Sequence, residues 1–421
     1  MPRQDGAAGN SRKYRLKLWV VVGALAVATA LARPGAAAVV ECASGDVACL
    51  IAAVNAANAS AGADTIQLQP GVYVLTAPDN DTDGANGLPS ITGPLTIIGA
   101  GPGNTIIERE ATGPDFRLFH VAQTGVLKLQ GVTVRGGRLR NGPFPFDGGG
   151  LLNLGTTIIS QSAVTDSTTG FGPGSGAGGG IASLGKLVIA GSIISRNTSS
   201  GPGGGVSSRL GLLAVLNSTI SSNRGDFGGG LFIGDGVPAT IIGTTIADNL
   251  ATDGSGGGVF SSSAVAIINS TLTGNRTNFG GGGLAGGSGI IVNTTIANND
   301  GGFSGDALFA SSALAVYNTI VSGSLVPFGP PACGSQVTSL GNNLFTQASC
   351  AVALLSSDLT GDPRLGDFVD DGTPGHGFLP LLRRSPALNA ADAAGCLPTD
   401  QRGHRRNAKG CDIGAIEGVR P

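Results

Sequence analysis

The stretch GGGLFIGDGVPATIIGTTIADN, residues 228–249, decides the fold because it recurs in altered form along the chain. GGGVFSSSAVAIINSTLTGN follows at 256–275 and GGGLAGGSGIIVNTTIANN at 281–299. Seven aligned segments of about 24 to 30 residues carry this phrase. Such a period is typical of a solenoid, in which each unit buries its apolar face only by stacking on its neighbours.

Aligning the repeats places aliphatic residues in three columns. Three residues after the start of the Asn-Ser-Thr-Ile-like phrase stand Val134, Val164, Ile194, Ile220, Ile246, Leu272, Ile296 and Val321. Two residues before that start stand Leu129, Ile159, Ile189, Val215, Ile241, Ile267, Ile291 and Val316. After the glycine triplets stand Leu151, Ile181, Val206, Leu231, Val259, Leu284 and Leu308. Short alternating apolar segments separated by turns predict strands, about three per coil. We therefore expect an all-β protein, a right-handed parallel β-helix of about ten coils.

Two polar columns predict the corners of the coils. The phrase begins mostly with Asn or Gly, the residues that most readily accept a positive φ, at Gly131, Gln161, Gly191, Asn217, Gly243, Asn269, Asn293 and Asn318. A sharp left-handed turn is therefore expected there. Six residues later a second column comprises Asn197, Asn223, Asn249, Asn275 and Asn299. Stacked asparagines are expected to form hydrogen bonds along the axis, as in other stacked sheets.

The chain divides into four regions. Basic residues, the apolar run 18–32 and Ala36-Ala37-Ala38 predict a secretory signal peptide over residues 1–38. An uncleaved anchor is the alternative, but the run is shorter than the ~20 residues that span a bilayer. We expect an N-terminal cap and irregular coils over 39–130, with a short helix at Val47–Ala59. Regular repeats follow over 131–326, and a C-terminal region at 327–421 is expected to cover the last coil.

Charge excludes some classes of partner. The chain has 25 Lys and Arg against 27 Asp and Glu, and removal of residues 1–38 leaves 19 against 26, a net charge near −7. Nucleic acid and anionic membrane surfaces bind clusters of Lys and Arg, which are missing here. We expect no nucleic-acid partner, no membrane insertion after signal cleavage, and a monomer.

Six cysteines form three couples that are close in sequence: Cys42 with Cys49, Cys333 with Cys350, and Cys396 with Cys411. Export would favour disulfides. Fifteen connectivities are open to six cysteines, and the local pairing is the favoured one because of proximity. A zinc site is the competing interpretation, but no CxxC or neighbouring His supports it.

Aromatic residues beside the glycine triplets are the candidate ligand-binding residues. The corner between the Asn column and the next triplet varies in length, and in repeat proteins such a corner often lies on the binding face. We expect Phe146, Phe227, Phe279 and Phe303 to contact successive sugar rings of an extended glycan, with Asp147 and Asp226 binding hydroxyl groups. The alternative is that each Phe folds back and seals its own coil, because exposed aromatic stripes are costly.

Evidence for metal or catalytic chemistry is thin. Asp79, Asp81 and Asp83, with Gly84, have the spacing of a calcium loop, but the twelfth position is Ser90 instead of Glu, so an ordinary turn is favoured and calcium is the weaker alternative. Asp166, Arg196 and Asp248 share a column, where we expect a surface ion pair between the first two. His376 is expected in a loop. No catalytic residue and no other cofactor is predicted.

Motifs at both ends resemble a known group, bacterial secreted right-handed parallel β-helix proteins of the pectin lyase-like class. The triplet followed by Asn-Ser-Thr-Ile also resembles the repeats of polymorphic outer-membrane proteins. The C-terminal motifs resemble the choice-of-anchor Q domain and comprise residues 361–365, 385–387, 400–403 and 411–417. An opening segment is similar at residues 49–51, 56–58, 64–66 and 70–73. The resemblance implies a secreted or cell-surface β-helix without a settled activity.

Together these patterns favour a non-enzymatic interaction module that binds extended polysaccharide or another cell-surface component. One alternative is a polysaccharide lyase or glycoside hydrolase, which only fold analogy supports. Another is a passive structural adhesin without a specific ligand.

Overall fold

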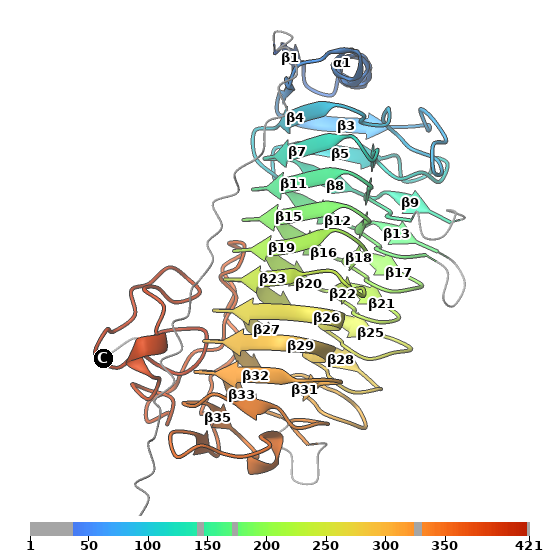
Figure 1. The fold of residues 1–421 in the computed structure, drawn as a ribbon. Helices are drawn as coiled ribbons and strands as arrows, with labels where there is room; N and C mark the ends of the chain where they lie inside the picture. Colours follow the sequence, from blue (N-terminus) through green and yellow to red (C-terminus); the bar gives the residue numbers. More distant parts are fainter. Residues whose placement is uncertain (1–36, 141–146, 171–175, 324–330, 419–421) are drawn as a thin grey trace, which may run out of the picture. The chain divides into compact units, whose positions relative to one another are not determined.

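The computed structural model describes residues 37–140, 147–170, 176–323 and 331–418. The predicted helix is α1, Val47–Ala59. Asp46 caps it by accepting a hydrogen bond from the backbone N of Cys49 at 2.9 Å. Its buried residues are Leu50, Ala53, Val54 and Ala57. This helix packs beside the first strands of a parallel β-helix (Figure 1).

One face of the β-helix is a sheet of twelve strands in the described part of the chain, with one strand from each successive turn. Its strands are β3 (Gly71–Leu75), β5 (Thr105–Arg109), β8 (Thr133–Arg135), β12 (Ala163–Thr165), β16 (Ile193–Ser195), β20 (Thr219–Ser221), β24 (Thr245–Ala247), β27 (Thr271–Thr273), β30 (Thr295–Ala297), β33 (Ile320–Val321), β35 (Leu344–Phe345) and β36 (Leu359–Thr360). Neighbouring strands pair in parallel and in register, as Ile220 does with Ile246.

A second sheet carries two strands of most turns. Its members are β1 (Val39–Cys42), β2 (Asp64–Leu68), β4 (Pro94–Ile98), β6 (Phe119–Val121), β7 (Val126–Gln130), β10 (Leu151–Asn153), β11 (Thr156–Ser160), β14 (Ile181–Ser183), β15 (Lys186–Ala190), β18 (Val206–Ser208), β19 (Leu212–Leu216), β22 (Leu231–Ile233), β23 (Ala239–Ile242), β26 (Val259–Ile268), β29 (Leu284–Val292), β31 (Leu308–Phe309), β32 (Leu314–Tyr317) and β34 (Thr338–Ser339). In β26 and β29 the two strands of a turn merge into one.

A third, short sheet lies next to the glycine triplets and comprises β9 (Arg138–Leu139), β13 (Thr168–Thr169), β17 (Thr198–Ser199), β21 (Arg224–Gly225), β25 (Leu250–Ala251) and β28 (Arg276–Thr277). A regular turn such as 151–169 therefore holds four short strands, β10 to β13, where the sequence pattern predicted about three. The predicted aliphatic columns lie in β10, β11 and β12, and the additional strand is β13, which holds only Thr168 and Thr169 and so carries no aliphatic residue.

The predicted aliphatic columns form the interior. Ile194, Ile220 and Ile246 stack in the twelve-stranded sheet, and each is fully buried. Every member of the other two columns also exposes at most 1% of its surface. The columns belong to one continuous apolar cluster that extends from Cys42 to Ala351. Burial of stacked aliphatic side chains is thus what holds the turns together.

Left-handed backbone marks two corners of each turn. The predicted corner is confirmed, since φ lies between 45° and 65° at every position from Gly131 to Asn318 in that column. A second left-handed column, five residues further on, was not predicted and holds Asp166, Arg196, Ser222, Asp248, Gly274 and Asn298. It escaped notice because most of its members are not Gly or Asn.

The glycine triplets are explained by close approach of neighbouring turns. A Cβ on Gly229, the middle residue of its triplet, would lie 2.4 Å from the carbonyl carbon of Leu250 in the next turn. A Cβ on Gly204 would meet the carbonyl carbon of Arg224 at 2.3 Å. No side chain fits at these distances, so only Gly allows the short third sheet to pack against this corner.

The asparagine column forms the predicted hydrogen-bonded ladder. Each side-chain amide up to that of Asn275 donates to the next Asn Oδ1, from Asn223 to Asn249 at 3.0 Å and from Asn249 to Asn275 at 2.9 Å. The same Oδ1 atoms accept the backbone N of the preceding Asn, and the second amide hydrogen goes to a backbone carbonyl such as that of Ile220. All five asparagines are buried, and each of these hydrogen bonds satisfies a group that has no access to water.

Only the first part of the predicted C-terminal cap covers the last turn. Residues 331–360 add β34, β35 and β36 to the end of the stack. The segment 361–418 instead runs back along the outer face of the twelve-stranded sheet (Figure 1). There it binds a column of threonines: Gly375 N donates to Thr219 Oγ1 at 2.9 Å, and Ala415 N donates to Thr295 Oγ1 at 3.0 Å.

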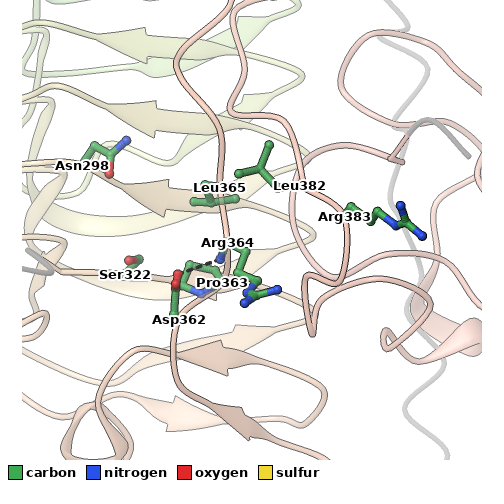
Figure 2. Close-up of a pocket in the computed structure, with 8 residues that line it drawn as sticks. All are labelled: Asn298, Ser322, Asp362, Pro363, Arg364, Leu365, Leu382 and Arg383. Atoms are coloured by element: carbon green, nitrogen blue, oxygen red, sulfur yellow. Dashed lines mark hydrogen bonds between the residues drawn. The ribbon is translucent and has the colours of Figure 1, made fainter. Parts of the chain in front are cut away.

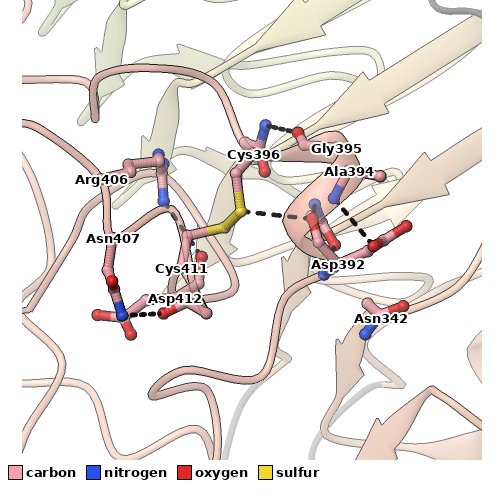
Figure 3. The surroundings of a disulfide bond; sticks show 12 residues. Asn342, Asp392, Ala394, Gly395, Cys396, Arg406, Asn407, Cys411 and Asp412 are labelled. Carbon is pink, nitrogen blue, oxygen red and sulfur yellow. Dashed lines mark hydrogen bonds between the residues drawn. A yellow bond between two sulfur atoms is a disulfide. The ribbon is translucent and has the colours of Figure 1, made fainter.

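All three predicted disulfides form: Cys42–Cys49, Cys333–Cys350 and Cys396–Cys411. The first joins β1 to α1, and the second closes a loop that contains β34 and β35. The third ties the short turn Ala393–Gly395 to Cys411 within the segment 361–418 (Figure 3). Asp392 caps that turn by accepting the backbone N of Ala394 at 3.0 Å.

The proposed signal peptide lies almost entirely outside the described residues, so it stays a prediction. Among the residues that the structure does describe, no helix combines the length and the apolar character needed to cross a membrane.

Candidate functional site

The aromatic residues predicted to bind ligand differ in exposure. Phe227 exposes 39% of its surface, Phe279 53% and Phe303 90%. All three lie in the corner that leads into a glycine triplet, where the chain connects one turn to the next. Phe146 lies outside the described residues.

Two further aromatic residues stand beside Phe227 on the second sheet. Phe232 and Phe260 are paired neighbours on β22 and β26, and their rings stack at 5.5 Å with planes only 4° apart. Phe227 contacts Phe260 edge to face at 5.4 Å. The guanidinium carbon of Arg209 lies 5.7 Å from the Phe232 ring centre, within the range of a cation–π contact.

Strand geometry points these rings outward. Leu231 and Ile233 are buried in the interior, and successive side chains of a strand alternate, so Phe232 between them faces away from the core. We call Arg209, Phe227, Phe232, Phe260, Phe279 and Phe303 the aromatic corner. It extends over several successive turns of the β-helix.

Sealing of the coil accounts for only part of the aromatic corner. The Phe227 ring covers the backbone of Gly254 so closely that a Cβ there would lie 2.3 Å from it. Phe227 thus does shield the neighbouring turn from water. Phe303, with nine-tenths of its surface in solvent, shields nothing, and Phe279 is more than half exposed. Exposed aromatic side chains grouped on one surface are typical of a binding face.

The two carboxylates predicted to bind sugar hydroxyls are buried instead. Asp147 is 2% exposed and Asp226 is 9% exposed. Asp226 Oδ1 lies 3.3 Å from the hydroxyl of Thr252 in the next turn. The structure therefore corrects the roles given to Asp147 and Asp226: both are turned into the protein, where a ligand hydroxyl cannot reach them.

Asp147 belongs to a buried charged cluster that sequence reasoning missed. Arg117, fully buried, donates to Asn86 Oδ1 and to the Asp83 carbonyl, each at 2.9 Å. His120, on β6, places Nδ1 2.8 Å from Ser90 Oγ and Nε2 3.3 Å from Asp83 Oδ2. The signal for this cluster was present in the segment Phe116–Val121, because Arg and His interrupt an otherwise apolar run.

Burial shifts the proton affinities within this cluster. Burial, reinforced by the charge of Arg117, lowers the pKa of His120 to about 4. Burial raises the pKa of Asp147 to about 6, although the charges of Arg117 and Arg209 act in the opposite direction. Burial also lowers the pKa of Arg117 to about 10, so it stays charged at neutral pH.

The two shifted groups should give opposite pH dependences of stability. The folded state holds the Asp147 proton more tightly than the unfolded chain, so stability falls as pH rises from about 4 to about 6. His120 stays neutral in the folded state, whereas the unfolded chain takes up a proton at a higher pH. Its contribution to the stability of the fold therefore falls as pH drops from about 6.5 to about 4. A tenfold change in proton affinity is worth about 1.4 kcal/mol, so each effect is on the order of 2–3 kcal/mol.

Single variants should separate these opposing effects in urea titrations at pH 4, 5, 6 and 7. Asp147→Asn is expected to become steadily less stable relative to wild type as pH falls, since only the His120 term remains. His120→Gln is expected to become less stable relative to wild type as pH rises. Parallel pH profiles of both variants and the wild type would contradict the assignment.

The three acidic residues of the proposed calcium loop do not converge. Asp79 and Asp81 are exposed, whereas Asp83 is directed toward His120. Within the described ranges, no group of three or more His, Cys, Asp or Glu side chains is placed to hold a metal ion. Nothing in this arrangement supports a calcium role.

The remaining predicted polar residues lie on the surface. Arg196 and Asp166 form the expected ion pair, with both guanidinium contacts between 2.8 and 3.0 Å. Asp248 occupies the same column without joining that pair. His376, in a loop as expected, lies 3.5 Å from the Asp371 carboxylate.

A cavity of about 350 Å³ opens where the segment 361–418 meets the last turns (Figure 2). Asn298 and Ser322 line it from the β-helix, and residues 362–365 and 382–383 line it from the C-terminal segment. None of its lining residues belongs to the aromatic corner. Sequence analysis did not find it, because its two walls are 40 or more residues apart along the chain.

No protein-family model matches this chain, and neither does any curated protein. Among solved structures, the A-module of the mannuronan C-5 epimerase AlgE6 from Azotobacter vinelandii is similar, with 16% sequence identity and a TM-score of 0.39. The match covers 76% of this chain and 96% of that one. A likeness at this level carries no inference about chemistry, so the function is argued from the residues of this chain alone.

Proposed function

We propose that this protein is a β-helical binding module for extended polysaccharide, and that the aromatic corner is its contact surface. One observation carries the proposal: Phe303, Phe279 and the ring pair of Phe227 and Phe260 are presented on one corner of successive turns, and the most distal ring is almost wholly exposed.

The chemistry of aromatic rings suits such a ligand. The face of a Phe ring is electron-rich, and the C–H groups on one face of a sugar ring are apolar and weakly positive, so the two stack favourably. Turns of the β-helix repeat every ~4.8 Å, which is close to the length of one sugar residue in an extended chain. Rings on successive turns can therefore contact successive or alternate sugars.

We further propose that the protein acts outside the cytoplasm, either secreted or on the cell surface. Its three disulfides support this location, because such bonds persist in oxidising compartments. The N-terminal sequence pattern agrees with export. Membership of the pectin lyase-like class and a choice-of-anchor Q domain remain predictions that rest on the sequence motifs.

The decisive variant replaces Phe227, Phe279 and Phe303 together with alanine. Each aromatic contact is worth about 0.5–1.5 kcal/mol, so affinity for a bound glycan should fall roughly tenfold to a thousandfold. Retardation of the purified protein in native gels containing polyuronates or neutral glycans measures the loss. The same incubations, assayed for cleaved or unsaturated products, test the alternative that the protein is a lyase or hydrolase.

A matched control replaces exposed aliphatic residues elsewhere. Val352, Leu354 and Leu355 are all more than 40% exposed and lie outside the aromatic corner. Their replacement with alanine should leave retardation unchanged. If the wild type runs unretarded with every glycan of a broad panel, the binding proposal fails and a passive structural role is favoured.

A further inference from the structure

The cavity between the β-helix and the C-terminal segment has the composition of a small-molecule site. Its volume, about 350 Å³, falls within the range of ligand pockets. Pro363, Leu365 and Leu382 supply apolar surface. Asn298 and Ser322 face them from the β-helix (Figure 2).

Two arginines belong to the lining of the cavity. Arg364 and Arg383 form no ion pair and no side-chain hydrogen bond with any residue that the structure describes. The side-chain amide of Asn298 likewise has no hydrogen-bond partner within the described ranges. In Figure 2 the Arg364 side chain lies beside Pro363 and Asp362, and that of Arg383 extends away at the rim.

The backbone at Arg364 is held in an unusual conformation. Its φ is 52°, in the left-handed region that residues other than Gly seldom adopt, whereas the positive φ of Asn298 across the cavity belongs to the left-handed column of the β-helix. Asp362 Oδ1 accepts the Arg364 backbone N at 2.8 Å, and Leu382 N donates to the Arg364 carbonyl at 2.9 Å. Strained residues that their surroundings hold in place are concentrated at ligand sites.

We propose that this cavity binds a hydroxylated monocarboxylate, such as a sugar acid. The Arg364 guanidinium matches a carboxylate in geometry and charge, and Arg383 can add a second contact by turning inward at the rim. The Asn298 amide and the Ser322 hydroxyl suit ligand hydroxyls. Leu365, Leu382 and Pro363 suit the apolar face of a ring.

The charge balance favours a monoanion over a dianion. Two guanidinium groups and one carboxylate, that of Asp362, leave the lining with a single net positive charge. One ligand carboxylate would balance this net charge. The second negative charge of a phosphate or sulfate dianion would have no cation left to balance it and would be repelled by Asp362. The ligand would contact both the β-helix and the segment 361–418, so binding stabilises the docked segment.

Isothermal titration of the full chain with glucuronate, glucose, acetate and inorganic phosphate tests the proposal. Glucuronate should bind more tightly than the other three. Arg364→Asn, in which Asn keeps the left-handed backbone, should weaken glucuronate binding at least about tenfold, since a charged hydrogen bond is worth about 1.5–3 kcal/mol. Arg383→Gln should weaken it less, and Lys409→Gln, an exposed lysine in the same segment, should leave it unchanged.

The outcomes are independent of the aromatic corner. The triple Phe variant should bind glucuronate like the wild type, because its substitutions lie on a different surface. Failure of glucuronate to bind, binding of glucose with equal affinity, or equal losses in the Arg364 and Lys409 variants would each overturn the proposal. Thermal unfolding at a fixed glucuronate concentration gives a second readout: the wild type should gain more stability than Arg364→Asn.

Discussion

Replacing Asn249 with alanine is expected to destabilise the β-helix by about 3–5 kcal/mol, one of the two largest effects we predict. The substitution removes two donors and one acceptor from a buried column. It leaves the backbone N–H of Asn223 without its acceptor. It also takes one hydrogen-bond partner each from the Asn223 side-chain amide, the Ile220 carbonyl and Asn275 Oδ1, in a place that water does not reach. Each orphaned buried group costs about 1–3 kcal/mol.

Urea denaturation followed by far-UV circular dichroism measures this effect. Asn278→Ala is the matched control, because Asn278 lies in the same region with an exposed side chain. Its free energy of unfolding should stay within about 0.5 kcal/mol of that of the wild type. If Asn249→Ala were as stable as the control, the ladder would contribute nothing to the fold.

Replacing Arg117 with methionine should be comparably damaging, by about 3–5 kcal/mol, because it breaks a buried charged network by removing one member. Methionine roughly fills the space but leaves Asn86 Oδ1 and the Asp83 carbonyl unsatisfied. It also removes the positive charge that favours the ionised form of Asp147. Thermal unfolding at pH 7 measures the loss.

A double substitution tests the coupling. Asp147→Asn added to Arg117→Met should restore part of the lost stability, because the buried carboxylate is no longer present without its counter-charge. Arg135→Met is the control, since the half-exposed ion pair of Arg135 with Glu108 should contribute less than about 1 kcal/mol. Additive losses in the double variant would show that Arg117 and Asp147 act independently.

The regular part of the fold could be predicted because its determinants are local and repeated. Ile220, Ile246 and Leu272 recur at a fixed spacing, and the same spacing places them in register across neighbouring strands. The asparagine ladder follows from the same repetition. Each relation joins residues one turn apart, which a period in the sequence displays directly.

The path of residues 361–418 could not be predicted in this way. Gly375 meets Thr219 and Gln401 meets Thr245, contacts between residues 156 positions apart. Their partners Thr219, Thr245, Thr271 and Thr295 do form a column in the sequence. However, nothing in a periodic pattern says which distant, non-repetitive segment will cover that column.

For the candidate sites too, sequence predicts what one repeat contains but not what depends on contacts between turns. Sequence placed Phe227, Phe279 and Phe303 at a corner, which is correct, but could not distinguish a shielding ring from an exposed one. Asp147 and Asp226 appeared suited to binding because they neighbour aromatic residues. Their burial depends on how the corner folds back onto the next turn, and no single repeat contains that information.

The backward course of the C-terminal segment also changes how the molecule should come apart. A stack in which every turn touches only its two neighbours can fray from its end, one turn at a time. Here the segment is bonded to Thr219, Thr245, Thr271, Thr295 and Asn318, so peeling away the last turn together with this segment would also break contacts as far back as the turn of Thr219. Roughly the second half of the protein, from Thr219 onward, should consequently resist pulling and proteolysis as one block and unfold in a single step.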